Sequence, residues 1–439
     1  MEKREKTSGD SLKEPPAESQ QPGLGALVAA FGKIGLLSFG GPAAQISLMH
    51  RLLVEEKAWL SERQYLNALS FCMLLPGPEA MQIATYAGWR LRGLLGGLIG
   101  GLLFVLPGAL VVLILAGLYA ELGDLPLVAT LFLGIKAAVL IIVIEALLRV
   151  SKRALKGRVF WVIAALSFIG IFFLTLPYPL IVLGAALFGF FFCANADSVE
   201  SAPSQATRWS HTAGTICFWL VLWALPFIAL AILDAPEILS DIGAFFSKLA
   251  VVTFGGAYAV LAYMGQDVVT AFGWLTAGEM IDGLGLAETT PGPLILVTEF
   301  VGYLAAYREG GLGLGLVGAV LTLWVTFVPC FLWIFAGAPY IDWICAQPRL
   351  SGALSAITAA VVGVILNLSL WFGLQVIFAT VTPQTYGPLT LWQPELSTLD
   401  WRVIVLAAVC ALMLLKFHWS IVRVLPVSAA LGWALVQAV

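Results

Sequence analysis

Long stretches without a charged residue constrain this chain more than any other feature. Residues 93–120, 159–196 and 310–341 contain no Asp, Glu, Lys or Arg, and a helix needs about 20 residues to cross the apolar core of a bilayer. Only 11% of all residues are charged and 60% are hydrophobic, whereas a soluble domain carries roughly 25% charged residues. This composition excludes a soluble enzyme, a nucleic-acid-binding protein and a disordered protein, and it indicates a polytopic membrane protein.

The apolar runs predict an all-α membrane protein with about thirteen hydrophobic segments. Strands of a membrane barrel would alternate apolar and polar residues over about ten positions, and these runs are continuously apolar. The expected segments are 25–46, 66–88, 94–119, 126–148, 159–176, 178–195, 213–233, 241–264, 281–304, 311–338, 351–379, 401–416 and 419–437. Residues 1–24 are charged and Pro-rich and lack the apolar stretch of a signal peptide, so we expect a flexible cytoplasmic tail.

Orientation follows from Lys and Arg in short loops, which favour the cytoplasmic side. Residues 149–158 hold five of them, and the tail is also basic, whereas 120–125 and 380–400 hold none. We therefore expect a multi-pass protein of the inner (plasma) membrane with its N-terminus in the cytoplasm. If both segments that flank the basic loop 50–63 crossed the membrane, this loop would lie outside, against the rule. A re-entrant hairpin would instead keep it near the cytoplasmic side.

An internal repeat is the strongest signal in the sequence. FGKIGLLSFGGPA at 31–43 matches FSKLAVVTFGGAY at 246–258, and the Pro-Gly-Pro at 76–78 matches that at 291–293. One constant spacing along the chain relates both pairs of motifs, so the chain contains two copies of one unit.

The number of segments between the copies is odd, which turns the second copy over in the membrane. We expect a first transporter repeat at 25–196, a loop and linker helix at 197–240, and a second repeat at 241–439. Inverted repeats are typical of secondary transporters, whose substrate sites lie near the midplane at broken or re-entrant helices.

The two Pro-Gly-Pro motifs predict breaks in helices, because proline lacks a backbone N–H and glycine is flexible. Each helix that begins after such a break presents free N–H groups, which favour an anion. The candidate residues are Pro76, Gly77 and Pro78 with Pro291, Gly292 and Pro293. A simple kink is the structural alternative.

The Phe-Gly-Gly motifs form a second pair of candidate breaks. Tandem glycine lets the backbone approach a ligand closely, and a Ser or Thr hydroxyl precedes each pair. The candidate substrate-binding residues are Ser38, Gly40 and Gly41 with Thr253, Gly255 and Gly256. Close helix packing through small residues is the equally weighted alternative.

Charged residues inside membrane segments are costly and therefore mark candidate sites. Lys33 and Lys248 occupy matched positions, Lys136 lies in the middle of its segment, and all three are candidates for binding an anion. Because desolvation disfavours a charged carboxylate, a glutamate at such a site suits proton coupling. The candidate proton-coupling residues are Glu79, Glu288 and Glu299. Structural ion pairs or positions at the membrane surface are the alternative for each charge.

The cysteines and histidines show no metal-binding spacing, and no catalytic constellation is present in the segments. We expect no metal, no cofactor and no enzymatic activity.

With both motif pairs in view, the sequence resembles the chromate ion transporter family in its long, two-domain form. The resemblance is carried by FGKIGLLSFGGPAAQI and LLPGPEAMQIATYAGWRLRGLLGG in the first half, and by FSKLAVVTFGGAYAVL and GLAETTPGPLILVTEFVGYL in the second. It covers nearly the whole chain from about residue 25. The motif positions of the family are matched by Ser38, Gly40, Gly41, Pro42, Pro76, Gly77, Pro78, Glu79, Gly255, Gly256, Pro291, Gly292 and Pro293.

The resemblance implies export of chromate driven by an ion gradient, with sulfate as a chemical analogue, and the candidate glutamates make the proton the expected coupling ion. The expected partners are the oxyanion, the coupling ion, the lipid bilayer and, as a further candidate, a second copy of the chain in a homodimer. The alternatives are a transporter that imports or exchanges sulfate or another oxyanion, an anion channel, and a scaffold that transports nothing. The second copy has Ala257 in place of Pro42 and Leu294 in place of Glu79, so the halves are expected to be functionally unequal.

Overall fold

The computed structural model describes residues 22–123, 125–193, 209–254, 256–345 and 347–438. Most of the expected tail, and Gly255 of the candidate site, lie outside the described residues.

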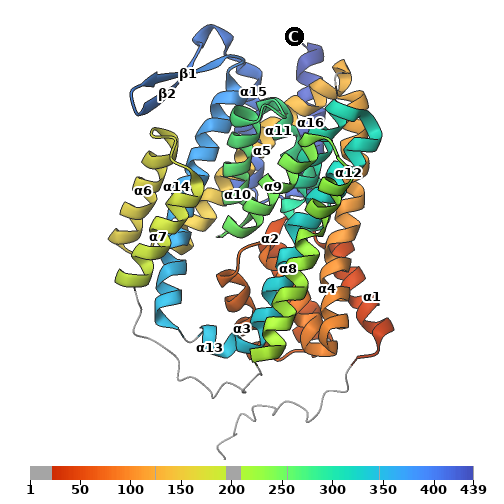
Figure 1. The fold of residues 1–439 in the computed structure, drawn as a ribbon. Helices are drawn as coiled ribbons and strands as arrows, with labels where there is room; N and C mark the ends of the chain where they lie inside the picture. The colour runs from red at the N-terminus through yellow and green to blue at the C-terminus, as the bar shows by residue number, and fades with distance from the viewer. Residues whose placement is uncertain (1–21, 124, 194–208, 255, 346, 439) are drawn as a thin grey trace, which may run out of the picture.

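Six helices of the described chain are long and apolar enough to cross a membrane. They are α4 (Glu79–Leu122), α5 (Pro126–Ala154), α8 (Trp209–Ile232), α12 (Val297–Gly337), α14 (Pro348–Ile377) and α16 (Ile421–Ala438). Many of their large apolar side chains are exposed, as expected of a surface that faces lipid. The prediction of an all-α polytopic membrane protein is confirmed (Figure 1).

The remaining helices are shorter. They are α1 (Leu24–Leu37), α2 (Gly41–His50), α3 (Glu62–Leu74), α6 (Arg158–Phe172), α7 (Tyr178–Phe192), α9 (Glu237–Val252), α10 (Ala257–Gln266), α11 (Ala277–Thr289), α13 (Ile341–Cys345) and α15 (Trp401–Ala411). Single π-helical turns lie at Arg51–Glu56, Asp267–Ala271 and Leu412–Lys416, and 3-10 turns lie at Leu294–Leu296, Ala338–Tyr340 and Leu396–Thr398.

Two of the expected spans are pairs of half-length helices. Segment 25–46 consists of α1, with 14 residues, and α2, with 10 residues, separated at Ser38. At 1.5 Å per residue these helices are about 21 and 15 Å long, less than the roughly 30 Å of a bilayer core. Segment 241–264 is divided in the same way into α9 and α10. The breaks predicted at the two Phe-Gly-Gly motifs are confirmed, whereas the count of thirteen segments remains a prediction from hydropathy.

Helix α4 is a hairpin rather than one straight rod. Its backbone leaves helical geometry at Arg92 and at Gly93, whose φ is +60°. A Cβ atom built on Gly100 would lie 2.3 Å from the carbonyl oxygen of Ala84. Residues 79–91 therefore fold back against the remainder of α4, so only the second arm is free to cross the membrane.

Helix α12 repeats this hairpin in the second copy. Its turn lies at Gly310 and Gly311, and a Cβ on Gly318 would lie 2.5 Å from the carbonyl oxygen of Gly302. Expected spans 66–88 and 281–304 are thus each a half-length helix, a Pro-Gly-Pro break and the short arm of a hairpin.

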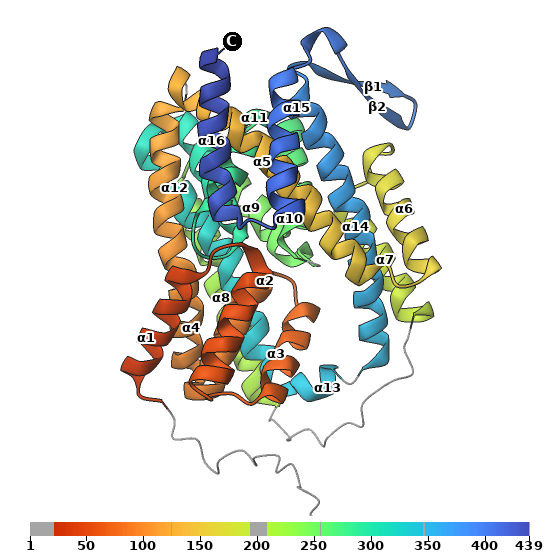
Figure 2. The same cartoon turned by 180° about the vertical axis from the view of Figure 1, so that it is seen from behind.

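The half-length helices of the two copies lie at opposite ends of the molecule. In both views α1, α2 and α3 lie in the lower half, while α9, α10 and α11 lie in the upper half (Figures 1 and 2). Helix α8 precedes the second copy in the chain and starts at the lower end (Figure 1). Because the half-length helices enter from opposite ends, the breaks of both copies come together in the interior.

The loop that contains residues 380–400 includes a β-hairpin. Strand β1 (Val381–Tyr386) pairs antiparallel with β2 (Leu389–Pro394), and Gly387 supplies a φ of +61° at the turn. The N–H of Thr390 donates a 2.7 Å hydrogen bond to the carbonyl of Phe173, which ties the hairpin to the turn between α6 and α7.

Candidate functional site

The breaks of one copy are bonded to the breaks of the other. The N–H of Gly77 donates to the carbonyl of Thr253, and the N–H of Gly292 donates to the carbonyl of Ser38, each at 2.9 Å. Each Pro-Gly-Pro motif is thereby paired with the Ser/Thr-Phe-Gly-Gly motif of the opposite copy. The motifs that the sequence repeat singled out therefore form one centre between the two repeats.

Glycine is required where these backbones cross. Gly77 and Gly292 have φ values of +118° and +91°, which side chains other than glycine adopt only with strain. A Cβ on Gly77 would lie 2.9 Å from the Sγ atom of Cys330, and one on Gly108 would lie 2.1 Å from the carbonyl oxygen of Pro291.

Helices begin at these breaks without a side-chain cap. The N-cap residues of α2, α4, α10 and the turn that leads into α12 are Gly40, Pro78, Gly256 and Pro293, and none makes a side-chain cap hydrogen bond. By contrast, α3 and α11 begin with complete capping boxes at Ser61 and Thr276. The first N–H groups of a helix carry partial positive charge, so these four interior helix starts suit an anion.

The predicted hydroxyl groups lie at the breaks but donate elsewhere. Ser38 donates to the carbonyl of Ile34 at 2.6 Å, and Thr253 donates to that of Leu249 at 2.5 Å. Both hydroxyl donors are occupied within their own helices, and the backbone carbonyls of the same residues make the contacts between repeats.

Two glutamines that the sequence analysis missed stabilise the breaks. Gln45 donates to the carbonyl of Gly292, and Gln82 donates to the carbonyl of Pro76, each at 2.7 Å. Both side chains are buried, and in both the Oε1 atom has no partner among the described residues. Only their amide polarity within apolar segments could have marked them.

The three predicted carboxylates have different environments. Glu288 is buried and accepts a 2.7 Å hydrogen bond from the hydroxyl of Tyr258, in α10. Glu299 is 1% exposed, and neither of its carboxylate oxygens has a partner in the described part of the chain. Glu79, in the first turn of α4, is half-buried.

The three predicted lysines also lie apart. Lys33 is exposed on α1, and Lys248 is exposed on α9 with its Nζ 5.6 Å from the ring centre of Tyr263. Lys136 forms an ion pair with Asp282 of α11 at 3.3 Å. Thus only Lys136 has a carboxylate of the opposite repeat within ion-pair distance in the described structure, and Asp282 was not identified from the sequence.

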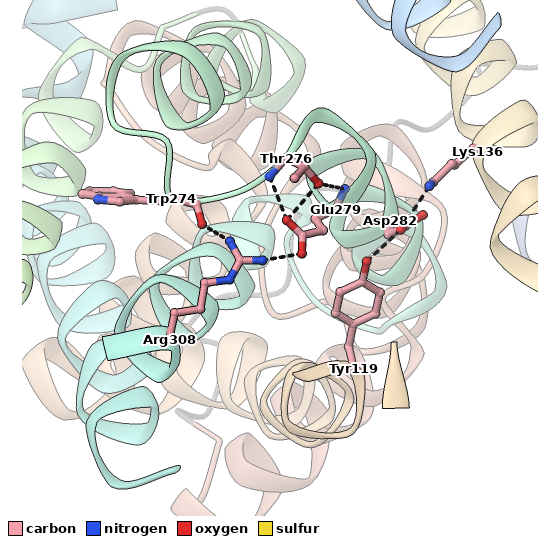
Figure 3. A network of polar contacts seen from close by, with 7 residues as sticks. All are labelled: Tyr119, Lys136, Trp274, Thr276, Glu279, Asp282 and Arg308. Carbon is pink, nitrogen blue, oxygen red and sulfur yellow. Dashed lines mark hydrogen bonds and ion pairs between the residues drawn. The ribbon is translucent and has the colours of Figure 1, made fainter. Parts of the chain in front are cut away.

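The Lys136–Asp282 pair lies in a pocket of about 460 Å³. The hydroxyl of Tyr119 donates to Asp282 at 2.8 Å, and Arg308 binds Glu279 and the carbonyl of Trp274 (Figure 3). The pocket is lined by residues of α4, α5, α11 and α12, so it too lies between the repeats.

Comparison with known proteins shows the family of this chain. A sequence model described as the chromate transporter matches residues 25–190 and 240–433. The chain belongs to the chromate transporter family. It is 34% identical to a chromate transport protein of Pseudomonas aeruginosa over 77% of this chain and 78% of the relative. It is 31% identical to a chromate transport protein of Cupriavidus metallidurans, over 78% of this chain and 80% of the relative. No solved structure matches the chain significantly.

The two halves of this chromate transporter family member are not equivalent at their breaks. Helix α4 begins directly at Glu79, whereas a 3-10 turn with Leu294 at the matched position precedes α12. Within the described residues, no group of three or more His, Cys, Asp or Glu side chains is arranged to hold a metal ion. The polar features of the centre are therefore backbone N–H groups, amides and single charges.

Proposed function

We propose that this transporter exports chromate from the cytoplasm in a proton-coupled cycle and that sulfate competes for the same site. The observation that carries the proposal is the bonded centre of four uncapped helix starts, contributed equally by two repeats. A transporter that alternates between two open states needs such a site where its repeats meet.

The dianion is held by the helix N-termini at the breaks and by one or more of Lys33, Lys136 and Lys248, of which Lys136 borders the 460 Å³ pocket. Two opposite unit charges about 4 Å apart attract by about 4 kcal/mol at an effective dielectric constant near 20. One lysine together with helix ends is therefore sufficient to offset part of the dehydration of a dianion. Lys33 and Lys248 remain candidates, although both side chains are exposed.

The coupling proton is carried by Glu79, Glu288 or Glu299. Glu299 is the best placed of the three by environment, because both of its oxygens are buried without a partner among the described residues. A charge buried in this way is costly, and a proton removes it. We further propose that the N-terminus and the basic residues 149–158 face the cytoplasm.

The decisive experiment measures chromate uptake into inside-out membrane vesicles with and without an energising gradient and with excess sulfate. Uphill, gradient-dependent accumulation that sulfate inhibits is expected. Flux only down the concentration gradient would indicate a channel instead. Sulfate flux without chromate flux, in vesicles that contain folded protein, would reassign the substrate.

A further inference from the structure

The pocket between α4, α5, α11 and α12 contains a buried carboxylate that the two motif pairs do not include. Asp282, on α11 of the second repeat, is 4% exposed. Its Oδ2 atom accepts a hydrogen bond from Tyr119 and forms the ion pair with Lys136 (Figure 3). Both of these partners belong to the first repeat.

The two oxygens of Asp282 are used unequally. Oδ2 receives both contacts, whereas Oδ1 is buried and has no hydrogen-bond partner among the described residues. A buried acceptor without a partner is unfavourable and calls for an explanation. Oδ1 is the free position at which this carboxylate can take up a proton.

Lys136 is reachable by a small anion. A quarter of its side chain is exposed (26%), and it borders the 460 Å³ pocket. Its ammonium group lies 3.2 Å from where a Cβ of residue 278 would stand, so Gly278 leaves room for it. Arg308, the other cation of the pocket, is already bonded to Glu279 and to a backbone carbonyl.

The remaining charged groups around Asp282 are few. Glu279 lies on the same helix, and Tyr307 of α12 donates to Glu121 of α4. The charged residue of α16, Arg423, is exposed, and the one of α14, Arg349, lies over the ring of Phe190. Lys136 is therefore the cation that balances Asp282.

We propose that the Asp282 carboxylate and an oxyanion dianion compete for binding to Lys136. Protonation of Asp282 at Oδ1 weakens its ion pair with Lys136 and so favours binding of the oxyanion. This inference rests on the proposed function, since it needs an oxyanion that reaches Lys136. When the carboxylate accepts a proton from water in the pocket, the aspartic acid is neutral and the ammonium is free to bind the dianion. Oxyanion binding at Lys136 is then accompanied by uptake of one proton.

The pairing of a lysine with a buried aspartate is not repeated at the matched positions of the other repeat. At the spacing that relates the two Pro-Gly-Pro motifs, Asp282 corresponds to Asn67 of the first repeat. The segment GIKAAVL of the first repeat matches AITAAVV of the second, and this match places Thr358 opposite Lys136. The residues that match Asp282 and Lys136 in the other repeat, Asn67 and Thr358, carry no charge. Proton linkage of this kind therefore acts on one side of the transport cycle.

The test is sulfate binding to the purified transporter by calorimetry between pH 6 and pH 8, because sulfate stays a dianion over this range. The wild-type protein should bind sulfate up to about tenfold more tightly for each unit that the pH falls. It should take up protons from a weak buffer when sulfate is added. Asp282→Asn should bind sulfate with little pH dependence, and Lys136→Ala should bind it weakly at every pH.

Glu121→Gln is the matched control, because it removes an exposed carboxylate beside the pocket and leaves Tyr307 a hydrogen-bond acceptor. This variant should keep the pH slope. Sulfate binding without a pH slope or proton uptake in the wild type would overturn the inference and leave the proposed oxyanion site intact. If sulfate binding to folded Asp282→Asn still depended on pH as in the wild type, the inference would also be overturned and the proposed oxyanion site would stand. Absence of any sulfate or chromate binding to the wild type would remove both proposals.

Discussion

The N–H of Gly77 in the first repeat donates a 2.9 Å hydrogen bond to the carbonyl of Thr253 in the second, and Gly292 and Ser38 repeat this bond in the opposite direction. Both carbonyls stand at the ends of helices, where the helix itself offers no donor. The reciprocal pair thus satisfies broken helices inside the membrane, where water cannot do so. It also links each repeat to the other at the place where an oxyanion is proposed to bind.

Gly77→Ala should abolish chromate transport. A side chain at a φ of +118° strains the backbone by about 1–3 kcal/mol, and its Cβ would lie 2.9 Å from Cys330. The readouts are vesicle uptake and the melting temperature in detergent, which should fall. Gly184→Ala, with nothing within 4 Å of the new methyl group, is the control and should transport normally. Normal transport by Gly77→Ala would show that the crossing of the backbones is not needed.

Lys136→Ala should abolish transport while the protein still inserts into the membrane. The change removes one of the two cations of the 460 Å³ pocket and leaves Asp282 buried without its ion-pair partner. Uptake should be compared with that of Lys152→Ala, an exposed lysine in the last turn of the same helix, which should retain activity. Parallel measurement of Lys33→Ala and Lys248→Ala ranks the three predicted lysines. Full activity of Lys136→Ala would remove this residue from the site.

Glu299→Gln should uncouple transport from the proton gradient without lowering the melting temperature. Glutamine keeps the volume of the side chain and removes the cost of a buried charge that has no partner in the described chain. Gradient-driven accumulation of chromate should disappear while exchange of labelled chromate across the membrane continues. Glu237→Gln, at an exposed position in α9, should behave as the wild type does. An unchanged response of Glu299→Gln to the gradient would assign coupling to another carboxylate.

Asp400→Ala should lower the melting temperature at neutral pH, with a loss of about 1 kcal/mol typical of a removed N-cap. Asp400 accepts a 3.0 Å hydrogen bond from the N–H of Arg402, and the hydrogen bond from the Arg402 side chain holds the pKa of this carboxyl below its ordinary value. A lowered folded-state pKa contributes stability above the ordinary carboxyl pKa and loses it as the pH falls through the lowered one. The difference between wild type and variant should therefore shrink in acid, and a difference independent of pH would contradict this role.

The sequence by itself determined the class of protein, the repeat and the residues at the breaks. Long uncharged runs indicate segments that lie in the bilayer. Such segments must be helical there, because their backbone groups have to be hydrogen-bonded within the helix. Gly and Pro at Gly77, Pro78, Gly292 and Pro293 act through local backbone geometry, so their effect is readable from the chain alone. The constant spacing between the repeated motifs likewise needs no structure.

Only the tertiary structure decided which distant groups meet. Nothing in the sequence pairs Gly77 with Thr253 or Lys136 with Asp282, because those contacts depend on how two inverted repeats pack. The Phe-Gly-Gly motifs predicted breaks within 25–46 and 241–264, but only the structure showed which distant backbone groups satisfy the broken helices. Lys33, Lys136 and Lys248 are each a single lysine within an apolar segment, so the sequence did not distinguish among them. Packing gave Lys136 an ion-pair partner in the other repeat.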